Sequence, residues 1–245
     1  MGARFLILWF LLRDGMADAG VLYLVPTPIG NLQDITLRAL EILKSVDLIA
    51  CEDTRRSGQL LAHFGIQARK VSYFEHNEIR RVPEIISVLK EGKSVAVISD
   101  GGSPGLSDPA YRVVTAAVEA SIRVEALPGP TAAIPALTAS GLPTDRFFFE
   151  GFLPVKPGKR RKRLEDLRDL PHTIVIYESV HRVQKSLADI AAVFGDRPIC
   201  LGRELSKLHE EYIRGTASDI AAGLEKNRLK GEFVIVIAGN RMAEG

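Results

Sequence analysis

Apolar runs alternate with helical patterns along the first half of the chain. The runs carry little polar alternation and predict strands buried on both faces. They lie at Val21–Val25, Val46–Cys51, Val71–Tyr73, Ser94–Ser99 and Ile122–Leu127. Helices are predicted between them, from Leu37 onward after Asp34 or Thr36 as the cap, over Ile79–Leu89 and over Ala110–Ala120. This alternation predicts an α/β fold with a mostly parallel sheet that helices cover on both faces.

A second cycle of strands and helices follows the break at Ser140–Pro143. Apolar residues at helical spacing from Val183 to Phe194 predict one of its helices. Its predicted strands are Phe147–Phe149, Thr173–Tyr177, Ile199–Leu201 and Phe233–Ala238. We therefore expect an N-terminal extension over residues 1–20, an α/β domain over 21–140 and a second α/β domain over 141–240.

Three turns rich in glycine and proline follow predicted strands directly. They read Pro26-Thr27-Pro28-Ile29-Gly30-Asn31, Asp100-Gly101-Gly102-Ser103-Pro104-Gly105 and Pro128-Gly129-Pro130-Thr131. Turns at the carboxyl ends of strands form the ligand crevice of open α/β sheets, and glycine permits close approach to the backbone. The second turn has neither GxGxxG spacing nor a P-loop lysine, so a dinucleotide or nucleoside triphosphate is disfavoured. Taken alone, each turn also fits an ordinary structural loop, with Thr131 as a helix cap.

Composition narrows the class of protein only a little. With 46% hydrophobic and 25% charged residues the chain has ample material for packed cores, and its net charge of +2 assigns no partner. Cys51 and Cys200 lack CxxC spacing, and the five histidines lack a spacing such as HExxH. We therefore expect two core thiols in a reducing cytoplasm, and no metal.

The N-terminus resembles a signal peptide in outline, with eight apolar residues at Phe5–Leu12. Arg13 and Asp14 interrupt that outline, and Met16 offers a natural start shortly before the first strand. We interpret residues 1–15 as an extension, with a peripheral helix or a signal as the alternatives. No segment is long and apolar enough to predict a membrane-spanning helix, so no membrane association is expected.

The turns belong to a longer ordered set of motifs that closely resembles the tetrapyrrole-methylase superfamily. Within it the set is similar to the bacterial branch that 2′-O-methylates a cytidine in small-subunit (16S) ribosomal RNA. The resemblance runs from about Leu22 to Gly239, with Gly101-Gly102-Ser103-Pro104 in place of the usual Ala-Gly-Thr-Pro. The remaining motifs are Ala50–Arg55, Glu75–Glu78, Ser107–Pro109, Tyr177–Arg182, Arg203–Lys207 and Lys230–Glu232.

The resemblance implies a two-domain methyltransferase, typically a homodimer, with S-adenosyl-L-methionine in a cleft between the domains. Asp100 and Glu178 are expected to hold the ribose or amino-acid end, because a carboxylate too near the sulfur would stabilise the ground state more than the transition state. Carried over by motif, the further cofactor contacts are Ile29, Gly101, Gly102, Ser103, Leu106, Thr131 and Ala132.

A dense basic run carries the argument for an RNA partner. Six of the eight residues from Lys156 to Arg163 are positive. If they open a helix, they lie at the end where the macrodipole disfavours cations, so a polyanion explains them better than local stability does. A solvated charged loop is the alternative. The predicted RNA-binding residues are Arg55, Lys159, Arg160, Arg161, Lys162, Arg163 and Arg182.

A ribose hydroxyl must lose its proton to become a nucleophile, and three residues compete for that role. His76 lies in a polar cluster just past a predicted strand, and Glu204 and Lys207 share a later motif. The motifs do not decide among them, and each also has an ordinary structural interpretation.

These observations predict a cytoplasmic S-adenosyl-L-methionine-dependent enzyme that 2′-O-methylates a cytidine of 16S ribosomal RNA, free or in the small subunit. Two alternatives remain. A tetrapyrrole methyltransferase shares the fold, although that branch typically shows a Gly-x-Gly-x-Gly-Asp first turn. A non-catalytic RNA-binding assembly factor would explain the basic run but not the three turns.

Overall fold

The computed structural model describes residues 20–224 and 231–240 and divides the chain into two compact units. The first unit runs to Thr27 and continues over Gln33–Pro130, and the second comprises Pro28–Leu32 and the chain from Thr131 onward. The expected boundary near Gly141 is therefore about ten residues late, because the helix before it packs on the second sheet. The expected extension over residues 1–20 lies, up to residue 19, outside the described residues.

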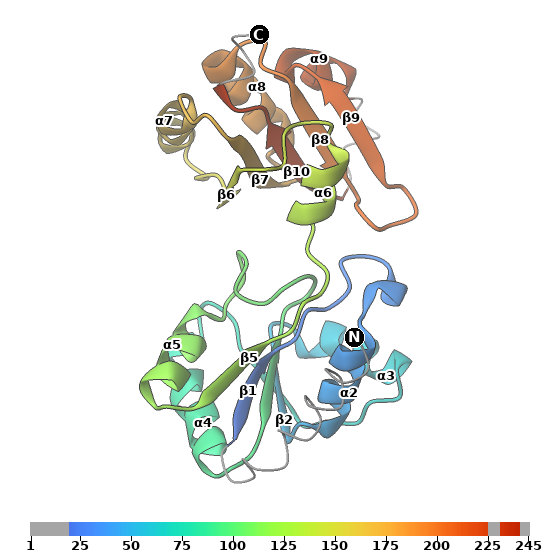
Figure 1. Cartoon of the computed structure of the whole chain (residues 1–245), viewed down its shortest axis with the longest axis vertical. Helices are drawn as coiled ribbons and strands as arrows, with labels where there is room; N and C mark the ends of the chain where they lie inside the picture. Colours follow the sequence, from blue (N-terminus) through green and yellow to red (C-terminus); the bar gives the residue numbers. More distant parts are fainter. Residues whose placement is uncertain (1–19, 225–230, 241–245) are drawn as a thin grey trace, which may run out of the picture. The chain divides into compact units, whose positions relative to one another are not determined.

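The first unit is built on a parallel five-stranded sheet in the order β3-β2-β4-β1-β5 (Figure 1). Every neighbouring pair is parallel, as the sequence predicted. β2 and β4 are buried at every position, because they lie inside the sheet with both faces covered. The strands are β1 Val21–Leu24, β2 Leu48–Cys51, β3 Lys70–Ser72, β4 Val95–Ile98 and β5 Arg123–Ala126.

Helices cover both faces of this sheet (Figure 1). The Thr36 side chain caps the first by accepting the Ala39 N–H at 3.0 Å. α2 Leu37–Ser45 and α3 Thr54–His63 pack on one face, and α4 Glu78–Lys90 and α5 Tyr111–Glu119 pack on the other. The sequence patterns predicted three of these four and missed α3, whose polar residues obscure its apolar stripe.

The second unit has a mixed sheet in the order β6-β7-β10-β8-β9. β6 runs parallel to β7, and the other neighbouring pairs are antiparallel. The sequence missed β9, an edge strand whose two charged residues are half-buried or exposed. The strands are β6 Phe147–Phe152, β7 Thr173–Ser179, β8 Ile199–Arg203, β9 Glu211–Gly215 and β10 Glu232–Ile237.

The two faces of the second sheet are covered unequally. α7 Pro157–Leu167, α8 Val183–Phe194 and α9 Ala217–Gly223 pack on one face. The short helix α6 Ala133–Ala139 packs on the other, together with Ile29 from the returning segment that ends at the 3-10 turn η1 Leu32–Asp34. One face of the sheet thus packs against three helices, and the other against one short helix and the segment at Ile29.

Candidate active site

Hydrogen bonds join the predicted turns after β1, β4 and β5, three strands that are neighbours in the first sheet. Thr27 and Gly102 each donate an N–H to the other's carbonyl oxygen at 2.9 Å. The buried Thr27 hydroxyl donates to the Ser99 carbonyl at 3.0 Å, and the Ser103 hydroxyl donates to the Pro130 carbonyl at 2.9 Å. The turns thus form one connected backbone surface at the carboxyl edge, where ligands bind in open α/β sheets.

Glycine is required in these turns for two distinct reasons. Gly102 has φ of 97°, in the region that side chains disfavour, and it is buried by its bridge to Thr27. Gly129 lies so close to Pro26 that an added Cβ would stand 2.6 Å from the proline Cβ. Gly101 is exposed instead. Of the two glycines predicted to contact the cofactor, Gly101 therefore offers the more accessible backbone.

Carboxylates surround the end of β4. The Asp100 carboxylate accepts the Asp53 N–H at 3.2 Å and pairs with Arg56 at 2.9 Å. Burial and the charge of Glu52 raise the pKa of Asp108 to about 6, against a hydrogen bond from Ser99. Burial, together with the charge of Asp100, also raises the pKa of Glu52. Clustered carboxylates resist ionisation together, so this edge favours a ligand that brings positive charge.

The described residues contain no group of His, Cys, Asp and Glu side chains suited to hold a metal ion. Cys51 and Cys200 are free and buried, and burial raises the pKa of both thiols. Across residues 20–224 and 231–240, none of the helices is both long and apolar enough to cross a membrane.

In the second unit, Tyr177 organises the segment that carries two predicted cofactor contacts. Its hydroxyl accepts the Ala133 N–H at 3.1 Å and lies 3.2 Å from the Thr131 hydroxyl. Thr131 is therefore not the helix cap: Ala132 precedes the first residue of α6 and makes no side-chain cap. Ile29 and Ala132 both pack against the cluster on this face of the sheet. Tyr177 begins the motif Tyr177–Arg182, but no role was predicted for its side chain from the sequence.

Glu178 occupies a different environment from the one expected of a cofactor contact. Its side chain is fully buried, and Ser186, Ser179 and Arg182 all contact its carboxylate. The Ser186 hydroxyl donates at 2.5 Å and the Ser179 N–H at 2.7 Å. A carboxylate enclosed in this way supports the start of α8, and the contact of Glu178 with the cofactor stays a prediction.

The three candidate bases fall in different environments. His76 is exposed in the turn after β3, with its ring edge-on to Phe74 at 6.2 Å between centroids. In the second unit, the Lys207 ammonium lies 2.7 Å from Glu204 and 3.0 Å from Glu232. Burial opposes ionisation of both groups, yet their mutual hydrogen bonds prevail and lower the pKa of Glu204 and raise that of Lys207.

The turn that carries Glu204 and Lys207 is tightly built. Glu204 has φ of 51° and Ser206 has φ of 65°, which is uncommon for residues with side chains. The Lys207 stem covers Gly30, where an added Cβ would collide with it. This turn thus holds Lys207 as a fixed cation, and a protonated ammonium is a poor proton acceptor.

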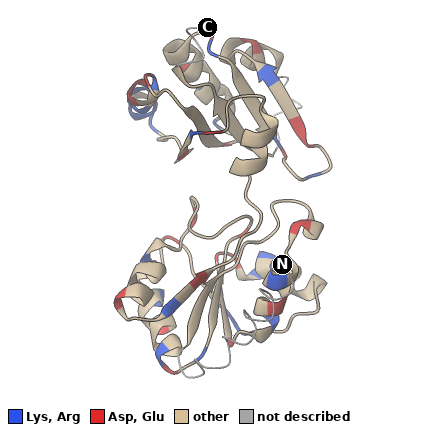
Figure 2. Cartoon of the chain, viewed as in Figure 1, with Lys and Arg blue, Asp and Glu red and all other residues tan. Residues whose placement is uncertain are grey.

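The predicted basic run forms the start of α7, where Figure 2 shows Lys and Arg side by side. Lys159, Arg161 and Lys162 are exposed, as is Arg55 on α3. Arg160 is only 4% exposed and pairs with Asp189 at 2.6 Å, so its side chain supports the fold, and its contact with RNA stays a prediction.

Three other predicted RNA contacts also pair with carboxylates. The Arg161 guanidinium, although exposed, lies 2.8 Å from Asp189. Arg163 makes two hydrogen bonds of 2.7 Å to Glu150. Arg182 contacts Glu178 and donates to the Leu153 carbonyl at 2.6 Å. The guanidinium groups of Arg163 and Arg182 thus support the fold around α7 and α8.

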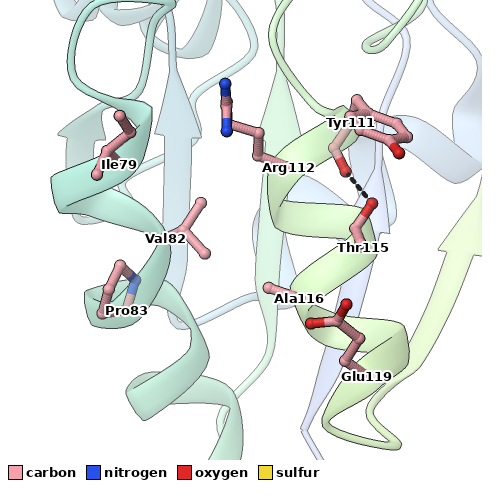
Figure 3. Close-up of a pocket in the computed structure, with 8 residues that line it drawn as sticks. All are labelled: Ile79, Val82, Pro83, Tyr111, Arg112, Thr115, Ala116 and Glu119. Atoms are coloured by element: carbon pink, nitrogen blue, oxygen red, sulfur yellow. Dashed lines mark hydrogen bonds between the residues drawn. The ribbon is translucent and has the colours of Figure 1, made fainter.

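A cavity of about 310 Å³ lies between α4 and α5, and none of the residues that line it is a predicted site residue (Figure 3). Ile79 and Tyr111 flank it, and both are strongly exposed. Arg112, one of its two charged residues, pairs with Glu78 at 2.9 Å. We assign this cavity no part in the chemistry.

Solved structures with the same architecture are methyltransferases. The uroporphyrin-III C-methyltransferase of Thermus thermophilus aligns with a TM-score of 0.63 at 23% identity, over 89% of this chain and 94% of that one. A cobalt precorrin-4 methyltransferase aligns with a TM-score of 0.64 at 20% identity, over the same shares of the two chains. At this level of identity the likeness shows the fold.

Sequence relatives are much closer. The ribosomal RNA small subunit methyltransferase I of Escherichia coli O157:H7 is 49% identical over 92% of this chain and 80% of its own length. The protein of that name from Streptococcus pyogenes serotype M3 is 48% identical over 90% of this chain and 77% of its own. The family model of tetrapyrrole (corrin/porphyrin) methylases matches residues 21–221. The chain therefore belongs to the tetrapyrrole methylase family.

Proposed function

We propose that this chain transfers a methyl group from S-adenosyl-L-methionine to the 2′-hydroxyl of a cytidine ribose in 16S ribosomal RNA. The observation that carries the proposal is the set of three hydrogen-bonded turns at the carboxyl edge of the first sheet. It forms a small-molecule site in a chain about 48% identical to ribosomal RNA small subunit methyltransferases over 90% of its length. The low identity to the tetrapyrrole methyltransferases of known structure favours the RNA substrate.

The residues at the carboxyl edge suit this cofactor. Its methyl carbon is already activated by the positive sulfonium, and the carboxylates beside β4 favour a cationic ligand. Pro26 and Pro28 lack N–H groups, so the first turn is not a phosphate cradle. We infer that Asp100, Gly101, Gly102, Ser103 and Leu106 hold the cofactor from the first unit. In the second unit we assign the same role to Ile29, Thr131 and Ala132.

We propose His76 as the group that accepts the proton of the ribose hydroxyl. An exposed imidazole can reach a substrate and accept a proton from its hydroxyl group. Lys207 is held protonated by Glu204 and Glu232, and the lowered pKa of Glu204 makes it a weak base. We therefore assign Lys207 the part of a fixed positive charge.

Single-turnover rates separate these roles. His76→Ala is expected to slow methyl transfer about 100- to 10,000-fold at saturating cofactor and RNA, and the defect should lessen as pH rises. Lys207→Gln, measured in parallel, should weaken RNA binding more than it slows the bound complex. If Lys207→Gln slows methyl transfer in the bound complex more than His76→Ala does, and His76→Ala remains nearly active, Lys207 is the base.

The relatives are named as methyltransferases of small-subunit ribosomal RNA. We propose that this chain acts on that RNA, in the cytoplasm, as a homodimer. Exposed cations at Arg55, Lys159, Arg161 and Lys162 supply the charge that a phosphate backbone requires. Sedimentation of the purified protein tests the dimer directly, and a monomer at micromolar concentration would refute it.

The function is tested by mapping ribose methyl groups on 16S ribosomal RNA from cells that lack the gene. One cytidine should lose its 2′-O-methyl group and regain it when purified protein, small subunits and S-adenosyl-L-methionine are combined. Gly101→Val serves as the matched inactive variant. An unchanged methylation map, or methyl transfer to a tetrapyrrole in place of RNA, would refute the proposal.

A further inference from the structure

Three phenylalanine side chains on the edge strand β6 are exposed. The exposed fractions are 42% for Phe147, 37% for Phe148 and 52% for Phe152. β6 ends the second sheet, and its outer edge pairs with none of the described strands. The pairing with β7 places Phe147 and Phe152 on one face of the sheet and Phe148 on the other. Two exposed rings on one face of an edge strand indicate an interaction site.

A β-bulge at Glu150 places these rings. The pairing with β7 runs from Phe149 opposite Val175 directly to Gly151 opposite Ile176, so that Phe152 lies opposite Tyr177. The extra residue brings Phe152 to the same side of the sheet as Phe149, on the face that α6 covers only in part.

Tyr177 gives this aromatic group a rigid base. The rings of Phe149 and Phe152 meet it edge-on, with centroids 5.0 and 5.7 Å away. Its hydroxyl is fixed by Ala133 and Thr131. Phe152 is therefore ordered on one side and open to a ligand on the other.

Positive charge follows Phe152 directly along the chain. Leu153 is buried and anchors the strand end, and Val155, Lys156 and Lys159 beyond it are exposed. Lys156 and Lys159 stand at the start of α7, a helix with no acidic residue in its first turn. The macrodipole disfavours cations there, so the helix itself gives no reason for them.

We propose that Phe152 and Phe147, with Lys156 and Lys159, form a stacking surface for unpaired nucleotides that flank the methylated position. Aromatic rings beside a cationic track are the combination that binds single-stranded nucleic acid, with bases on the rings and phosphates on the cations. Unpaired RNA also exposes the faces of its bases, which a protein partner lacks. The inference rests on the proposed function and assigns the side chains that would hold its substrate.

The test uses a single-stranded RNA oligonucleotide with 2-aminopurine beside the target cytidine, because stacking quenches its fluorescence. Phe152→Leu should lose the quenching and bind RNA about 5- to 150-fold more weakly. Phe152→Trp should restore both. Lys156→Gln with Lys159→Gln should lower the salt dependence of binding, whereas Phe152→Leu should not.

Tyr111→Leu is the matched control, since it removes an aromatic ring that is 79% exposed on α5 and outside this surface. S-adenosyl-L-methionine affinity, measured by calorimetry, should remain unchanged in Phe152→Leu and so exclude misfolding. If that variant disturbs the cofactor site, Phe147→Leu provides the same readout farther from Tyr177.

Two outcomes would overturn the inference. The first is RNA affinity and quenching in the Phe152→Leu and Phe147→Leu variants equal to those of the control. The second is a change of oligomeric state without a change in RNA affinity, which would make β6 an interface between copies of the chain. Failure of the proposed function is distinct from both, because the unaltered protein would then not methylate 16S ribosomal RNA.

Discussion

The basic run at α7 contains one arginine that the fold requires, and replacing it should separate stability from RNA binding. The Arg160 guanidinium lies 2.6 Å from Asp189 and donates to the Val155 carbonyl at 3.3 Å. The two side chains are 4% and 8% exposed. Arg160→Met removes the buried partner of Asp189 and leaves its carboxylate the hydrogen bond from Arg161 at 2.8 Å. We therefore expect a loss of about 1.5–3 kcal/mol in unfolding free energy. Lys159→Gln, on the exposed face of the same helix, should change it by less than about 0.5 kcal/mol.

A double variant isolates the pair. Arg160→Met with Asp189→Leu removes both charges and should regain most of the lost stability, because two apolar side chains of similar volume replace a desolvated ion pair. Burial alone would raise the pKa of Asp189, but hydrogen bonds from Arg161 and Arg160 lower it. The stabilisation is therefore complete above the unfolded pKa of about 3.9 and is lost as pH falls below it.

Urea denaturation measures the free energies, and hydrogen exchange in α7 and α8 places the loss in the second unit. RNA binding gives the complementary readout. Lys159→Gln with Lys162→Gln should reduce the salt slope by about 0.7 for each phosphate that is no longer neutralised, and Arg160→Met should leave it unchanged where the protein remains folded. An Arg160→Met variant of normal stability, or one with a reduced salt slope, would refute this assignment.

Three further predictions concern the candidate site. Gly101→Val should abolish S-adenosyl-L-methionine binding in a folded protein. Gly102→Val should also destabilise the protein, because φ of 97° strains a branched residue. Calorimetry and denaturation distinguish the two variants, and normal cofactor affinity in Gly101→Val would contradict the placement of the cofactor site. Asp108→Asn should stabilise the protein above pH 6, because ionisation of Asp108, with its pKa near 6, disfavours folding at higher pH. The variant should therefore lose less unfolding free energy than the unaltered protein between about pH 4 and 6. Parallel pH profiles of the two proteins would contradict this prediction. Tyr177→Phe leaves the Ala133 N–H without its partner, so it should lower the unfolding free energy by about 1–3 kcal/mol and weaken cofactor binding. Unchanged cofactor affinity would contradict the assignment of Thr131 to the cofactor site.

The strands of the first sheet were predictable because buried parallel strands are marked by continuous apolar runs. The domain boundary was not predictable. The apolar residues of Ala133–Ala139 indicate that the segment packs on a sheet, but they do not indicate which of the two sheets it packs on. The breaks at Ser140 and Gly141 mark the end of that helix rather than the end of a domain.

The burial of Arg160 could have been predicted from the spacing of residues in the basic run, although not from the number of its charges. Arg160, Leu164 and Leu167 follow one another at steps of four and three, which is the spacing of one helix face, and all three are buried. Lys159 and Lys162 fall outside that stripe. Treating the run as a single basic surface overlooked this periodicity. Its acidic partner on α8 is 29 residues away in the sequence and required the structure.

The strand order explains why the cofactor site and the RNA surface should respond separately to mutation. β1, β4 and β5 are distant in the sequence but adjacent as β4-β1-β5, so their turns meet through backbone hydrogen bonds such as those of Thr27 and Gly102. Such a site depends on main-chain conformation and tolerates few substitutions. The surface at Phe152 and Lys156 uses exposed side chains on a sheet edge and a helix start. Substitutions there should alter RNA affinity while the cofactor site remains intact, and this allows the two binding steps to be measured independently in one protein.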